Sequence, residues 1–255
     1  MRGSGGAVQH ELKILNLGCG YRTSPRCVNI DFSIGLRVKD SFVGRTGLAK
    51  LVFNGERWKS FDSITGDILV HNLKKGIPAE DSSIDAVYHS HVLEHLDRVD
   101  SDVVPAFLAE VLRVLKPGGV HRIVVPDMER LCRDYLSHLE ECVSTNRFTD
   151  EHDVIIGQLI TQMVRKEAYG TSRQPRLRRK IENLVLGDAR KRAETHQWMY
   201  DRVNLTCILD KAQFRDIRQV DHLTSSIPQW DTIALDRGPD GGEYKPGSLY
   251  VEAIK

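Results

Sequence analysis

The chain has 255 residues with 36 Lys and Arg against 35 Asp and Glu, a net charge of +1 that gives no indication of nucleic-acid binding. Its 40% hydrophobic content is ample for the core of one large α/β domain, and no apolar run approaches the length of a membrane span. Five cysteines, an odd number without C-x-x-C spacing, favour a reducing cytoplasm over a disulfide framework or a zinc site.

The first predicted strand, residues 14–17, runs into Gly18-Cys19-Gly20, and a second strand, residues 28–31, ends in Asp31. Two glycines let the backbone turn sharply and approach a ligand closely. A carboxylate at the end of the second strand can accept both hydroxyls of a ribose. The stretch is therefore typical of the start of a nucleotide-binding unit.

The loop between these strands discriminates between two cofactor classes. A dinucleotide site needs a third glycine and a helix N-terminus for the pyrophosphate, but Thr23 stands at the third position. Only nine residues lead from Gly18 to Cys27, fewer than the dozen or so that a helical crossover requires. We expect a loop or a single turn here, and hence a ligand without phosphates such as S-adenosylmethionine (SAM).

Residues 32–63 are predicted to form one or two short helices that pack on the sheet or shape the mouth of a cofactor site. A third strand at 67–71 precedes Asn72 and Leu73. The fourth strand, residues 84–89, ends at Ser90 and His91. Ligands of open parallel sheets bind beyond the carboxyl ends of the strands where the strand order reverses. Ser90 and His91 are therefore expected to face the ligand.

The pentapeptide from His91 to His95 also matches H-x-x-E-H, a pattern of zinc proteases with Glu94 as the base. It begins directly after a strand rather than within a long helix, and no separate downstream Glu ligand is evident. We therefore predict no metal, and a packing or hydrogen-bonding role for His95 stays open.

An amphipathic helix is predicted over 104–115, stopped by the sequence from Lys116 to Gly119. A fifth strand at 122–125 leads to Asp127, near the same edge as His91. The spacing of apolar residues beyond it predicts a further helix with a core-facing side: Leu131, Tyr135, Leu139 and Cys142.

Residues 144–193 contain two predicted helices, around 156–163 and 177–185. Between 165 and 192 there are ten Lys or Arg and three acids, a local charge of +7. A solvated helical face, a cap for an anionic substrate and a surface for acidic lipid remain open. Nucleic acid ranks last because aromatic residues are not interleaved with the basic ones, Tyr169 being the one aromatic residue of the stretch.

The segment from His196 to Tyr200 places Trp198 and Tyr200 either in a pocket wall or in the core. Asp201 is predicted to cap a helix over 203–212. Gln213 follows this helix, and a left-handed backbone there would cost about 1 kcal/mol. Strands at 216–221 and 248–254 complete the chain.

Four motifs, at 17–20, 90–96, 113–119 and 125–127, occur in the order seen in class I SAM-dependent methyltransferases, and the chain most resembles the type 11 group. The tail, residues 196–201 and 244–250, is similar to a subgroup often associated with sugar and natural-product biosynthesis.

The resemblance implies a Rossmann-like, seven-stranded, mostly parallel sheet with its last strand antiparallel. The implied organisation is a core at 7–143, a helical cap insertion at 144–193 and the rest of the core at 194–255. The implied cofactor is SAM, held by these residues: Asn16, Gly18, Cys19, Gly20, Asp31, Asn72, Leu73 and Ser90. The chain departs from its relatives at Asn72, where Asp is usual, and at Ala79, where Phe is usual.

The expected activity is transfer of a methyl group to a small-molecule or saccharide acceptor, which can be anionic, at a hydroxyl group. A general base with a pKa near neutral pH would assist the transfer by taking up the hydroxyl proton. His91 is the first candidate for this base, Asp127 the second and His196 the third. Trp198 and Tyr200 would contact the acceptor. The alternative is a SAM-binding scaffold or sensor without catalysis. The acceptor, O- against N- or C-methylation and the oligomeric state stay open.

Overall fold

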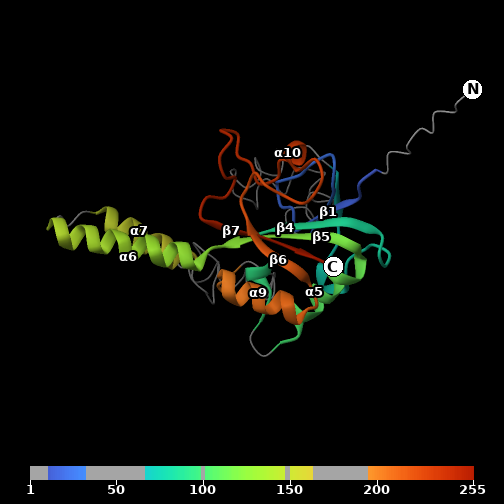
Figure 1. The fold of residues 1–255 in the computed structure, drawn as a ribbon, viewed down its shortest axis with the longest axis horizontal. Coiled ribbons are helices and arrows are strands. Elements are labelled where there is room, and N and C mark those ends of the chain that lie inside the picture. The colour runs from blue at the N-terminus through green and yellow to red at the C-terminus, as the bar shows by residue number, and fades with distance from the viewer. Residues whose placement is uncertain (1–10, 33–66, 99–100, 147–149, 163–194) are drawn as a thin grey trace, which may run out of the picture.

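The computed structural model describes residues 11–32, 67–98, 101–146, 150–162 and 195–255 (Figure 1). Several predictions fall wholly or mainly outside these ranges: the helices of 32–63, the helix around 177–185 and the basic stretch at 165–192.

Seven strands form one sheet in the order β3-β2-β1-β4-β5-β7-β6. The strands are β1 (Ile14–Leu17), β2 (Val28–Asp31), β3 (Ile68–Val70), β4 (Ile84–Ser90), β5 (Leu115–Pro126), β6 (Arg215–Val220) and β7 (Ser248–Ile254). The pairs among β1 to β5 are parallel, and β7 lies antiparallel between β5 and β6. This is the Rossmann-like α/β fold of class I methyltransferases, as predicted.

The helical elements are η1 (Leu73–Lys75), η2 (Leu93–His95), α5 (Val103–Val114), α6 (Met128–Thr145), α7 (Glu151–Gln162), α9 (Arg202–Lys211) and α10 (Trp230–Ile233). α5 and α9 cover one face of the sheet, and α10 lies on the opposite face (Figure 1). Each face buries its own hydrophobic cluster, with Leu108 and Leu209 in the first and Trp230 and Ile233 in the second.

Two local predictions are confirmed. The connection between β1 and β2 contains turns and no helix. Asp201 caps α9, where its carboxylate accepts from the N–H groups of Val203 and Asn204 at 2.9 and 2.8 Å. Gln213 has a left-handed backbone, with φ of 69°. α5 ends at Val114, and residues 116–119, predicted to stop the helix, already lie in β5, which is longer than predicted.

The prediction that α6 packs on the core is wrong. α6 leaves the end of β5 and projects away from the sheet beside α7 (Figure 1). Leu131, Tyr135 and Leu139 join neither hydrophobic cluster, and Cys142 is the single buried residue of α6. The amphipathic face exists, but its neighbour is α7 rather than the sheet.

Candidate functional site

A cavity of about 270 Å³ opens at the carboxyl ends of β1 and β4, which are the neighbouring central strands where the order reverses. Its volume is close to the lower end of the range of about 300–1,000 Å³ for small-ligand pockets. The residues lining it are Asn16, Gly18, Cys19, Gly20, Tyr21, Arg22, Tyr88, Ser90, His91, Tyr244 and Lys245. Five predicted cofactor residues and the first predicted base are thus brought together.

Two glycines shape one wall of this cavity for different reasons. Gly18 has φ of +62°, and a Cβ built there would lie 2.4 Å from Cγ2 of Val92, so no larger residue fits. Gly20 has φ of +52°, but a Cβ there would meet nothing within 4 Å. The backbone at Gly20 therefore faces open space beside the cavity, an arrangement suited to the close approach of a ligand.

Asp31 fixes this loop from β2. Its Oδ2 accepts a hydrogen bond from the backbone N–H of Gly20 at 2.9 Å, and the residue is 8% exposed. Burial and the Asp31 charge raise the pKa of the neighbouring Cys19 thiol to about 12. A thiol with so high a pKa stays protonated and unreactive at neutral pH. Cys19 is thus a wall of the cavity and no nucleophile.

The opposite wall comes from the distant segment at 234–245. The Arg22 guanidinium donates to the carbonyls of Ala234 and Leu235 at 2.6 and 3.0 Å and lies over the Tyr244 ring at 4.5 Å. These contacts join the loop after β1 to the segment that carries Lys245. Arg22 and Tyr244 lay outside the predicted site, since no spacing pattern links residues more than 200 positions apart, and the sequence left open whether Lys245 reaches it.

His91 lies between two polar partners at the end of β4. Its Nε2 is 3.0 Å from Oγ of Ser248, and its Nδ1 is 3.3 Å from Oε1 of Glu94. Its backbone is left-handed, with φ of 55°, and its N–H donates to the carbonyl of Val124 at 2.8 Å. A non-glycine residue in this conformation is held there by its surroundings. The ring is therefore fixed in orientation at the cavity.

The charges around His91 oppose its protonation. Burial, followed by the positive charge of Lys245, lowers the pKa of His91 to about 2. Burial also raises the pKa of Glu94 well above its usual value, and it lowers the pKa of Lys245. Although 3.3 Å is an ion-pair distance, the opposite pKa shifts of His91 and Glu94 favour a pair of neutral groups near pH 7.

His196 lies beside Glu94 and His95, and none of the three lines the cavity. The His95 and His196 rings are 4.8 Å apart, and burial, followed by His196, lowers the pKa of His95 to about 4. Ligand atoms of all three residues lie within 4.8 Å of one another, close enough for a cation. This cluster differs from the H-x-x-E-H arrangement, because residues 93–95 form the single turn η2 and His91 takes no part.

The other predicted acceptor-side residues have structural contacts. Asp127 caps α6 by accepting from the Arg130 N–H at 3.2 Å, and burial raises the pKa of Asp127. Tyr200 is 1% exposed within the main core, and Trp198 packs against that core with the Arg98 guanidinium 4.7 Å over its ring. None of Asp127, Trp198 and Tyr200 lines the cavity.

The predicted cofactor residues that follow β3, Asn72 and Leu73, also lie apart from the cavity. Oδ1 of Asn72 accepts from the Lys74 N–H at 3.0 Å and thereby caps η1, which begins at Leu73. A carbonyl oxygen has two lone pairs, so this cap leaves Asn72 one further acceptor position. Neither Asn72 nor Leu73 lines the cavity, whereas Asn16 and Ser90 do.

Comparison with known proteins gives one family match. The family described as "Methyltransferase domain" matches residues 48–123, a range that includes β3, β4, α5 and the beginning of β5. No curated protein matches the chain.

Among solved structures, the chain is similar to a SAM-dependent methyltransferase from Archaeoglobus fulgidus (14% identity, 97% of this chain and 87% of that chain, TM-score 0.41). It is also similar to the YcgJ protein from Bacillus subtilis (13% identity, 96% and 92%, TM-score 0.43). A third similar structure is a SAM-dependent methyltransferase from Aquifex aeolicus (12% identity, 97% and 84%, TM-score 0.39).

Proposed function

We propose that this protein transfers the methyl group of SAM to a hydroxyl group of a small-molecule or saccharide acceptor. The observation that carries the proposal is the cavity at the strand-order reversal, between the loop at Gly18–Gly20 and His91. The match of residues 48–123 to a methyltransferase domain supports the same reaction class. SAM supplies the activated methyl group on its sulfonium, so the chain mainly has to align the acceptor with it.

In this proposal the residues around the first loop hold the cofactor. Gly20 leaves space for close approach, and the acidic end of β2 at Asp31 suits the ribose hydroxyls. The second acceptor position of Asn72 suits the adenine amino group, with Leu73 against the ring. The wall formed by Asn16, Cys19 and Ser90 completes the pocket.

His91 is the base of the proposed reaction, assisted by Glu94. Its low pKa keeps the imidazole neutral, the form that can accept a proton, but a base of such low pKa retains that proton poorly. Glu94, 3.3 Å from Nδ1, has the higher affinity for a proton. Glu94 therefore stays protonated and orients the ring through Nδ1, while Nε2 of the neutral imidazole would take up the hydroxyl proton and release it to solvent.

Lys245 is proposed to bind an anionic group of the acceptor. It lines the cavity beside His91, and burial lowers its pKa. An anion bound next to a buried ammonium group stabilises the charged form and offsets the cost of burial. Asp127, His196, Trp198 and Tyr200 are kept as more distant candidates on the acceptor side.

Calorimetry with SAM, its demethylated product and NAD tests the cofactor assignment. We expect micromolar binding of SAM or its product and none of NAD. Asp31→Ala should weaken SAM binding at least about tenfold, because a ribose contact to a charged group contributes about 1.5–3 kcal/mol. Asp210→Ala, an exposed change on α9, is the matched control. Binding of NAD without SAM would refute the assignment.

Incubation with isotopically labelled SAM and a panel of glycans and small molecules tests the reaction. His91→Ala should leave SAM affinity nearly intact and reduce turnover about 10²- to 10⁴-fold. Full turnover in this variant would show that His91 is only structural.

One observation favours a second function, a SAM-binding scaffold or sensor. Both ring nitrogens of His91 already face protein partners, Ser248 and Glu94. Tight SAM binding without methylation of any acceptor in the panel would favour this second function.

A further inference from the structure

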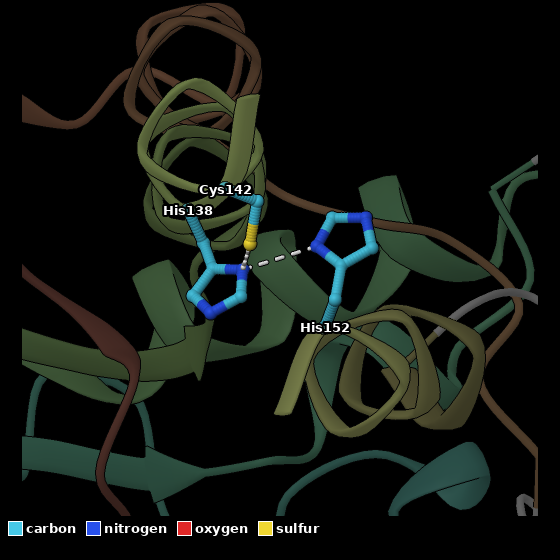
Figure 2. Close-up of side chains that lie close together, drawn as sticks. All are labelled: His138, Cys142 and His152. Carbon is cyan, nitrogen blue, oxygen red and sulfur yellow. Dashed lines mark hydrogen bonds between the residues drawn. The ribbon is translucent and has the colours of Figure 1, made fainter. Parts of the chain in front are cut away.

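Three side chains of types that can bind metals converge where α6 meets α7 (Figure 2), and none of them lines the cavity at the sheet. His138 and Cys142 lie one turn apart on α6, and His152 lies at the beginning of α7. Nδ1 of His138 is 3.1 Å from Nδ1 of His152 and 3.4 Å from Sγ of Cys142. We call these three residues the hairpin cluster.

The distances within the hairpin cluster are close to those of a zinc site. Zinc binds histidine nitrogen at about 2.0–2.1 Å and cysteine sulfur at about 2.3 Å in a tetrahedron, which separates two nitrogens by about 3.3 Å and nitrogen from sulfur by about 3.5 Å. The observed separations of 3.1 and 3.4 Å differ little from these values. All three ligand atoms lie within 4.8 Å of one another, so small side-chain adjustments would complete the geometry.

The chemistry of the donors selects the metal. Two imidazole nitrogens and one thiolate favour zinc or copper(I) over magnesium and calcium, which prefer oxygen. Cys142 is buried, whereas His138 and His152 are partly exposed, so the cluster is shielded on one side and open on the other. A water molecule can reach the open side as the fourth ligand of a tetrahedral ion.

The packing of the two helices gives such an ion a role. α6 buries Cys142 alone, and α7 buries no residue, so the hairpin that they form has almost no hydrophobic core. The ring stacking of His138 on His152, at 5.3 Å between centroids, lies at the cluster itself. Where a small unit lacks a core, a bound metal commonly supplies the missing stability.

From these observations we propose that His138, Cys142 and His152 bind one zinc ion that fastens α7 to α6. On binding, the Cys142 thiol loses its proton to solvent, both histidines present neutral Nδ1 atoms, and no oxidation or reduction takes place. The proposal is independent of the methyltransferase assignment, since the cavity at β1 and β4 shares no residue with the hairpin cluster.

Titration of the metal-stripped full chain with zinc, in competition with a chromophoric chelator, tests the proposal. We expect one zinc per chain, bound at micromolar or lower concentration. Cys142→Ser and His152→Ala should each weaken binding at least about 100-fold, since loss of partners that merely orient a ligand already costs about 10–100-fold. Cobalt(II) added to the wild type should give a thiolate charge-transfer absorption that Cys142→Ser abolishes.

Two further variants separate ligation at the hairpin cluster from ring stacking and from zinc binding elsewhere on the chain. His152→Cys should retain zinc, because cysteine is a zinc ligand but cannot reproduce the stacked imidazole pair. His196→Asn alters the other cluster, Glu94, His95 and His196, and should leave the affinity unchanged. Zinc lost in His196→Asn but retained in Cys142→Ser would overturn the proposal, as would the absence of zinc binding to the wild type.

Hydrogen exchange supplies a readout that does not depend on enzymatic activity. Zinc should slow the exchange of amides in α6 and α7 and leave those of β4 and β5 unchanged. Unchanged exchange throughout the hairpin would contradict a fastening role. The variants lie outside both hydrophobic clusters of the sheet, so circular dichroism should show the same folded content as the wild type.

Discussion

The sheet core and the hairpin each bring two histidine rings together, with opposite surroundings. On β4 and β5, Nε2 of His89 and Nε2 of His121 are 3.0 Å apart, nearly the 3.1 Å between His138 and His152. The core pair is 0% exposed and packed between Phe107 and Phe214. Burial lowers the pKa of His89 to about 3 and shifts that of His121 in the same direction.

The comparison shows that a short contact between histidines does not define a site. The core pair belongs to no metal-ligand cluster among the described residues and is fully buried among packed side chains. The hairpin pair has the thiol of Cys142 beside it and access to solvent. Charged groups differ in the same way, because the core encloses Arg122 between Asp236 and Glu252, whereas Arg133 of α6 pairs with Glu129 at the surface.

Among the variants compared between the two regions, those at the arginines should differ most in unfolding free energy. Arg122→Met removes the cation and leaves Asp236 and Glu252 buried together, at a cost of about 3–5 kcal/mol in unfolding free energy. Arg133→Met is the matched change on α6, where the arginine side chain is 71% exposed, and should cost about 0.5 kcal/mol or less. Urea unfolding of both variants measures this. Similar losses would contradict the distinction between core and hairpin.

The next effect is expected in the pH dependence of the unfolding free energy, which depends on the protonation of the core pair, His89 and His121. A histidine whose folded pKa lies below the unfolded value of 6.5 takes up its proton more readily in the unfolded chain. Stability is therefore full above about pH 6.5 and falls below it, by at most about 1.4 kcal/mol per pH unit for each ring. For His89 this loss continues down to about pH 3.

His91 and His95 also have lowered pKa values, so the contribution of the core pair has to be isolated by a difference. The double variant His89→Leu/His121→Leu should lose less stability than the wild type between pH 7 and pH 5, as followed by urea unfolding at each pH. Equal pH dependence in the two proteins would show that the core histidines are not neutral in the folded state.

The sheet was predictable because its strands are short apolar runs that end in recognisable residues. The turn at Gly18 and Gly20 and the capping Asp201 follow from local chemistry. The position of His91 at the ligand edge follows from topology, since β4 lies next to β1. Local patterns were sufficient wherever a single element determines the outcome.

Features that join distant segments were not predictable in this way. Lys245 reaches the cavity through the contacts of Arg22 with the segment at 234–245, which no periodicity encodes. The hairpin cluster has no C-x-x-C spacing to reveal it, because Cys142 pairs with histidines on two helices. The core position predicted for α6 is wrong because an amphipathic face does not specify which neighbour covers it.

Replacing one histidine of the core pair with leucine should lower the unfolding free energy less than replacing the buried Arg122. His121→Leu keeps most of the volume but removes the partner of His89 Nε2, a buried polar atom whose loss of a hydrogen bond costs about 1–3 kcal/mol. His89→Leu/His121→Leu removes both polar groups and should cost less than the two single variants together. Additive losses in chemical unfolding would mean that the two rings do not interact.

The smallest effect is expected for the hairpin pair in the absence of metal. His152→Asn removes the contact with His138 Nδ1, but His152 is partly exposed and α7 buries no side chain. Exposed changes usually alter the unfolding free energy by about 0.5 kcal/mol or less, so in the presence of a chelator this variant and the wild type should unfold at nearly the same urea concentration.

In the wild type alone, zinc should then raise the temperature at which the hairpin loses its structure, because only a protein with all three ligands binds the ion preferentially in its folded form. A loss above about 1 kcal/mol without metal would indicate that the stacked imidazoles themselves stabilise the hairpin, as the His89–His121 contact is expected to do in the core, and the contrast between the two pairs would then fail.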